Sequence, residues 1–156
     1  MSEEAFSAVD VPSADYLAKL GEVVYRVSDL EWAALDDPHA NHRLIDFSEL
    51  YKRSTGQIAE ALARVASEID QGEPQGHFLH VASRALQDIA PMRNRILHAR
   101  PEVMPDGSVC LLHLRSDASG VTEFAWIDEP YLDHVLGRID YWARRLARSS
   151  ARAPGR

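Results

Sequence analysis

Residues 76–101 read GHFLHVASRALQDIAPMRNRILHARP, and this stretch decides the fold because its apolar residues have the period of a long amphipathic helix. The stripe, at spacings of three and four residues, consists of Leu79, Ala82, Leu86, Ile89, Arg93 and Leu97. An arginine therefore stands where the pattern requires an apolar residue. Pro91 predicts a kink or short break just before Arg93, because proline removes a backbone donor and clashes with the preceding turn. Pro101 is expected to end the helix.

Three further segments share this helical period. Ser13 is a candidate N-cap for a helix that ends near Asp36, and its stripe comprises Leu17, Leu20, Val24, Val27, Leu30 and Ala34. Thr55 is a candidate cap for a second helix, whose stripe comprises Ile58, Leu62, Val65 and Ile69. Asp128 is expected to cap the last helix, with the stripe Leu132, Val135, Ile139, Trp142 and Leu146.

Turn residues at 105–107 and 117–120 flank two short runs of strand-forming residues, which predicts a β-hairpin within about 103–127. We expect a short helix around 47–51. The sequence thus predicts a mainly all-α chain, an antiparallel four-helix bundle with a short β-hairpin inserted between the last two helices. The bundle spans 13–149, between a disordered lead-in at 1–12 and a basic disordered tail at 150–156.

Composition indicates one globular domain. The 156 residues are 46% hydrophobic and 26% charged, without an apolar run of the ~18 to 20 residues that would span a bilayer. The first residues lack the features of a signal peptide, so we expect a cytoplasmic protein that does not contact membranes. The single cysteine, Cys110, cannot form an intramolecular disulfide.

Charge is unevenly distributed along the chain. The net charge of -7 argues against a general positive coat for nucleic acid, yet the C-terminal part is basic. The arginines there are Arg138, Arg144, Arg145, Arg148, Arg152 and Arg156. They suit either an arm that contacts phosphates or a solvated helix end whose cations complement the helix dipole.

Arg93, Asn94 and His98 form the most informative cluster. They supply a fixed cation, an amide that donates and accepts, and an imidazole that titrates near neutrality. These groups suit a phosphodiester, since RNA cleavage without metal needs a base, an acid and a cation at phosphorus. On a helix Asn94 and His98 share a face, whereas Arg93 lies about 100° away and points inward. Because one protomer supplies one such histidine, two copies around a two-fold axis would complete the site, which predicts a homodimer.

The string Arg-Asn-x-x-x-His near the end of a long helix, inside a small helical bundle, resembles the HEPN superfamily of ribonucleases and ribonuclease-like domains. The resemblance implies a dimeric, metal-independent endoribonuclease of toxin–antitoxin, antiviral defence or RNA-processing type, with Arg93 and His98 catalytic and Asn94 supporting them. An antitoxin or another regulatory protein would be a further partner. Superfamily toxins silenced by nucleotidylation have a tyrosine two residues after the histidine; here that residue is Arg100, so we do not expect this control.

Three residues are expected around the motif. Glu31 follows Val27 by one helical turn and is a candidate partner for Arg93, as an orienting carboxylate or a surface residue. Arg95 and Arg100 are candidate RNA contacts, or solvated surface cations. His77 and His80 have a ligand-like spacing, but without an accompanying cysteine cluster we expect neither metal nor cofactor.

The sequence leaves alternative functions open. Some superfamily members are catalytically inactive dimerisation, nucleotide-binding or scaffold modules, and a local motif does not separate these from a nuclease. In a third reading the chain is a helical partner protein in which Arg93 and His98 are purely structural. The alternatives differ in what these two side chains do.

Overall fold

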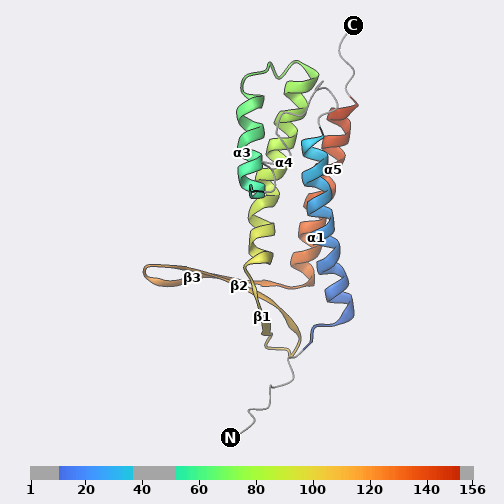
Figure 1. Cartoon of the computed structure of the whole chain (residues 1–156). Helices are drawn as coiled ribbons and strands as arrows, with labels where there is room; N and C mark the ends of the chain where they lie inside the picture. The colour runs from blue at the N-terminus through green and yellow to red at the C-terminus, as the bar shows by residue number, and fades with distance from the viewer. Residues whose placement is uncertain (1–10, 37–51, 152–156) are drawn as a thin grey trace, which may run out of the picture.

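The computed structural model describes residues 11–36 and 52–151, which form four helices and one three-stranded sheet (Figure 1). The elements are α1 (Ala14–Leu35), α3 (Thr55–Ala66), α4 (Pro74–Leu97), β1 (Arg100–Val103), β2 (Val109–Asp117), β3 (Gly120–Ile127) and α5 (Glu129–Ser150). The prediction of a mainly helical chain is confirmed. The short helix expected at 47–51 lies outside the described residues, as do 1–10 and 152–156 of the expected lead-in and tail. None of the described helices is long and apolar enough to cross a membrane.

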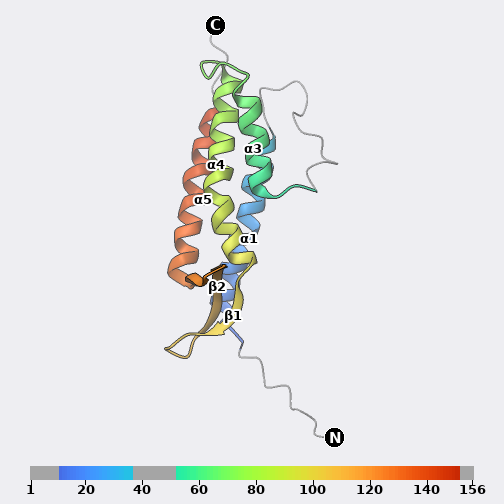
Figure 2. The same ribbon diagram turned by 90° about the vertical axis from the view of Figure 1, so that its left-hand side faces the viewer.

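The helices lie side by side with the sheet at one end (Figure 2). α4 contacts α1, α3 and α5 and runs in the opposite direction to each of them. α1 and α5, however, run parallel, because both begin at the sheet end. Their contacts show this register: Lys19 pairs with Glu129 near the two helix starts, and Arg26 pairs with Asp140 farther along. The expected antiparallel arrangement is therefore wrong for this pair.

The core is centred on α4, whose buried face includes Phe78, Leu79, Leu86 and Ile89, all with no exposed surface. Every residue of the stripe predicted for α5 is buried. The stripe predicted for α1 is wrong at two positions. Leu17 and Val24 are 45% and 50% exposed, because the face that packs inward is centred on Tyr16, Val23 and Val27.

The helix caps are largely those expected. The Ser13 and Asp128 side chains accept hydrogen bonds from backbone N–H groups in the first turns of α1 and α5. The cap of α3 is Ser54 rather than Thr55, and Ser54 and Gln57 form a reciprocal capping box. Thr55 is buried one position further on, where its hydroxyl donates to Glu31. Because Ser54 caps the helix, the Thr55 side chain is available for a contact between α3 and α1.

Of the kink or short break expected at Pro91, the break is absent, because α4 continues through Pro91 to Leu97. Pro91 lies on the exposed side of the helix. The carbonyl that loses its donor belongs to Gln87, which is also exposed, so water can replace the missing N–H. Packing of Ile89 and Ile96 on either side keeps the helix in place. Ile96 thus packs the last turn of α4 against the core.

The expected hairpin is present as β2 and β3, but it is part of a larger antiparallel sheet with the order β1-β2-β3. β1 was missed because Pro101 was interpreted only as a helix stop. Proline is tolerated on an edge strand, where a backbone N–H is not needed for pairing. The buried Tyr16 hydroxyl joins this sheet to α1: it donates to the Ile127 carbonyl at 2.7 Å and accepts from the Leu111 N–H at 3.1 Å.

We expect Gly76→Ala to destabilise the fold. An added Cβ at Gly76 would lie 2.2 Å from the backbone oxygen of Asp70, so the turn between α3 and α4 would have to shift, at about 1–3 kcal/mol. The matched control is Gly137→Ala on α5, where a Cβ meets nothing within 4 Å and should stabilise by about 0.5–1 kcal/mol. Urea unfolding measures both, and equal effects would contradict the expected clash.

Candidate functional site

The end of α4 divides the motif between two environments. His98 is the C-cap of the helix, and its backbone N–H donates to the Asn94 carbonyl at 3.0 Å. Asn94 and His98 are both exposed, whereas Arg93 is turned toward α1 and its side chain is 34% exposed. The helical geometry expected from the spacing is therefore present: an inward cation beside an outward amide and imidazole.

The Arg93 guanidinium lies between Glu31 and Asn94. Its Nε is 3.9 Å from Glu31 Oε1, and a terminal nitrogen donates to Asn94 Oδ1 at 3.5 Å. The Thr55 hydroxyl donates to the same oxygen of Glu31. The structure therefore brings Glu31, Arg93 and Asn94 together from two helices, with α3 contributing Thr55. Within the described part of the chain the His98 imidazole makes no hydrogen bond, and the residue is exposed.

Two pockets adjoin the Arg93–Glu31 pair. The larger, of about 230 Å³, lies between α1 and α4 and is lined by Val24, Val27 and Leu97 besides the pair itself. The smaller, of about 110 Å³, lies toward α3 and includes Trp32. Val24 and Leu97 are 50% and 51% exposed, so the ion pair has an apolar rim.

Arg95 and Arg100, the expected RNA contacts, have carboxylate partners instead. Arg95 pairs with Glu123 of β3 at 2.9 Å, and Arg100 pairs with Glu102 within β1 at 2.9 Å. Neither arginine lines the two pockets that contain Arg93. Each guanidinium has further N–H donors besides the one paired with its carboxylate, so contact of these two arginines with RNA stays a prediction.

Sequence reasoning missed a second polar cluster, in which Asp88 of α4 binds two residues of α5. Asp88 Oδ2 accepts from Arg138 Nε and a terminal Arg138 nitrogen at 2.9 and 2.6 Å, and from Trp142 Nε1 at 2.8 Å. Partial burial raises the pKa of Asp88, but the Trp142 and Arg138 hydrogen bonds and the charges of Arg138 and His134 outweigh it and hold the pKa below its ordinary value. The i, i+4 spacing of Arg138 and Trp142 was the available signal.

No group of three histidine, cysteine or acidic side chains within residues 11–36 and 52–151 is placed to hold a metal ion. Comparisons of the chain with protein-family models, with curated proteins and with solved structures found no match. Assignment to the HEPN superfamily therefore depends on the Arg93 to His98 motif and its position at the end of α4.

The Asp88 cluster predicts a pH-dependent contribution to stability. Because the pKa of Asp88 is lower in the folded chain, its stabilisation is complete above the unfolded pKa of about 3.9 and is lost as the pH falls through the folded value. Asp88→Asn should lower the free energy of unfolding by about 1–2 kcal/mol at neutral pH, and by less in acid. Urea unfolding at both pH values tests this, with the exposed Asp29→Asn as control; a deficit independent of pH would contradict it.

Proposed function

We propose that the chain is a HEPN-type, metal-independent endoribonuclease that acts as a homodimer, with its four described helices forming the bundle of that class. The observation that carries this proposal is the end of α4, where Arg93 is oriented by Glu31 and Asn94 while His98 faces solvent. A cation held beside an exposed imidazole supplies two of the groups that cleavage of a phosphodiester requires.

The proposed reaction needs two histidines. In one protomer His98 removes the proton of the ribose 2′-hydroxyl, and the 2′-oxygen attacks phosphorus. The bond from phosphorus to the 5′-oxygen breaks, and the second protomer's His98 protonates the departing oxygen. The products are a 2′,3′-cyclic phosphate and a 5′-hydroxyl. The two Arg93 side chains stabilise the negative charge that builds on the phosphoryl oxygens.

The apolar rim supports the dimer. Val24 of α1 and Leu97 of α4 flank Arg93 and are half exposed in the single chain, so two large apolar side chains lie at the surface beside the motif. Pairing of two such faces would bury them and bring two α4 ends together. The same pairing would supply the second His98 that the proposed reaction needs. The exposed apolar side chains and the chemistry therefore require the same partner, a second copy of the chain.

The alternative is a catalytically inactive HEPN-like module for dimerisation, nucleotide binding or scaffolding. One observation favours it: the Glu31 carboxylate already balances the charge of Arg93, and Arg95 and Arg100 are likewise paired. Fewer cations are then available for RNA at this end of the molecule than the sequence suggests. RNA cleavage separates the two functions.

We expect purified protein to cleave a mixed-sequence RNA in excess EDTA and leave 2′,3′-cyclic ends. His98→Ala should lower the rate by about 10²- to 10⁴-fold, because a general acid and base are lost together. His80→Ala, an exposed histidine elsewhere on α4, is the matched control and should retain full activity. Folded wild-type dimers that leave the RNA intact would favour the inactive module.

We also expect Val24→Glu to produce a folded monomer without nuclease activity, because a charge in the apolar rim opposes burial against a second copy. Analytical ultracentrifugation and the cleavage assay measure the two effects. Leu17→Glu is the control, since Leu17 is 45% exposed on the same helix but does not line the Arg93 pocket. A dimer that survives Val24→Glu would place the interface elsewhere.

A further inference from the structure

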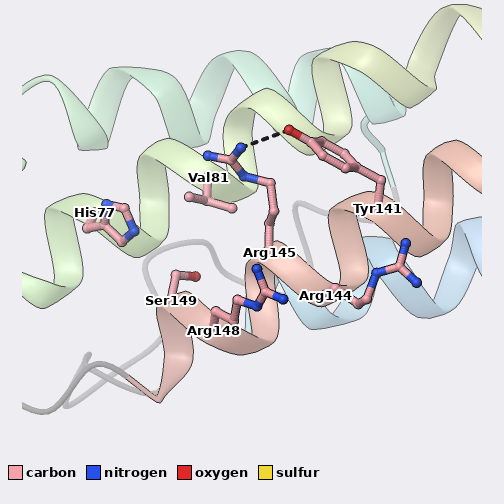
Figure 3. A pocket seen from close by; sticks show the side chains of 7 residues that line it. All are labelled: His77, Val81, Tyr141, Arg144, Arg145, Arg148 and Ser149. Carbon is pink, nitrogen blue, oxygen red and sulfur yellow. Dashed lines mark hydrogen bonds between the residues drawn. The ribbon is translucent and has the colours of Figure 1, made fainter.

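A second basic site lies at the other end of α4. A pocket of about 400 Å³ is formed between the first turns of α4 and the last turns of α5 (Figure 3). α4 contributes His77 and Val81 to its lining, and α5 contributes Tyr141, Arg144, Arg145 and Arg148. Among the described residues, the pocket walls thus contain three arginines and no carboxylate.

The orientation of Arg145 is fixed by aromatic residues of the same helix. A terminal nitrogen of Arg145 donates to the Tyr141 hydroxyl at 2.8 Å, and its guanidinium lies 5.5 Å from the Tyr141 ring centre and 5.7 Å from that of Trp142. Trp142 is itself bound to Asp88 of α4. Figure 3 shows Arg145 extending toward α4 above Val81, with Arg148 beside it. The cation is therefore held in place before any ligand arrives.

The charge of this pocket is not neutralised by the described residues. The two aspartates of α5, Asp133 and Asp140, form ion pairs with Lys19 and Arg26 of α1. Within residues 11–36 and 52–151, no carboxylate comes within ion-pairing distance of Arg144, Arg145 or Arg148. Arg144 and Arg148 are one helical turn apart, where like charges repel each other and destabilise a helix. A bound anion would relieve this repulsion.

We propose that this pocket binds the phosphate groups of single-stranded RNA and forms a second contact for the substrate, remote from His98. Guanidinium groups match phosphate oxygens with paired hydrogen bonds, and a preoriented arginine loses less freedom on binding. Because the whole chain carries a net charge of -7, a polyanion needs such a local cluster to bind. The choice of RNA as the anion rests on the function proposed above.

The spacing of the two sites sets the length of RNA that can use both. The helical rise places His77 about 24 Å from Arg93 along α4. At about 3.4 Å per phosphate of a stacked strand, this distance corresponds to roughly seven nucleotides. The pocket therefore assists strands of about this length or longer, and shorter fragments contact one site at a time.

The test is binding of a fluorescein-labelled oligouridine RNA of about 12 nucleotides, long enough to span both sites, measured by fluorescence anisotropy on the uncleaving His98→Ala protein. Arg144→Gln with Arg148→Gln should raise Kd about tenfold and reduce the slope of log K against log salt by about 1.4, the value for two lost phosphate contacts. The matched control is Arg64→Gln with Arg84→Gln, which removes the same charge from exposed positions outside the pocket and should have little effect.

A second variant distinguishes binding that needs a positioned Arg145 from binding that needs only the positive charge of the pocket. Tyr141→Phe keeps every cation but removes the hydroxyl that positions Arg145, and it should raise Kd about threefold with little change in the salt slope. Thermal melting verifies that each variant is folded. Equal effects of the pocket and control pairs would overturn the proposal, as would competition by polyglutamate as effective as that by RNA at equal charge.

This assay is independent of cleavage. Binding that depends on Arg144 and Arg148 in a protein that never cuts RNA would contradict the nuclease and retain the pocket as an RNA-binding site. Cleavage that proceeds with unchanged affinity in the pocket variant would contradict the pocket and retain the nuclease. The two proposals therefore fail separately.

Discussion

The ion pair between Arg93 and Glu31 lies where α1, α3 and α4 meet, and the geometry of the candidate site depends on it. Both side chains are partly shielded, so their attraction is stronger than that of a fully exposed pair, but each also loses part of its hydration. The Thr55 hydroxyl offsets part of that loss by donating to Glu31. A half-buried arginine without this carboxylate would turn toward solvent, and Asn94 would lose its neighbour.

The buried stripes of the helices were predicted best where the apolar residues of a helix lie on a single face. The α5 stripe was predicted completely because its charged and apolar residues separate sharply around the helix. α1 has apolar residues on more than one face, and the period alone did not distinguish buried Val23 from exposed Val24. Pro91 and Pro101 were misjudged for one reason: the cost of proline depends on whether the missing donor faces solvent, which local sequence does not specify.

The candidate site was predicted unevenly for a related reason. Positions within one helix follow from its period, so the split between inward Arg93 and outward His98 was accessible from spacing alone. Contacts between elements depend on the register of each helix along its neighbour, and the period of one helix does not give this register. The pairing of Arg95 with Glu123 requires the register of β3 against α4, and the Asp88 cluster requires that of α5. Glu31 was identified as a partner of Arg93, but its bond from Thr55 was not.

The ribbon of β2 and β3 extends well past the short β1 strand, which pairs only with the first residues of β2 (Figure 1). Beyond the Arg95–Glu123 pair it is two strands joined by a tight turn at Gly120, whose φ of +122° suits glycine. Among the tip residues whose burial the structure describes, none belongs to the buried core. Changes in the length or sequence of this tip would therefore leave the described packing of the core unaltered. For protein engineering it is a natural point at which to graft a peptide or insert a reporter.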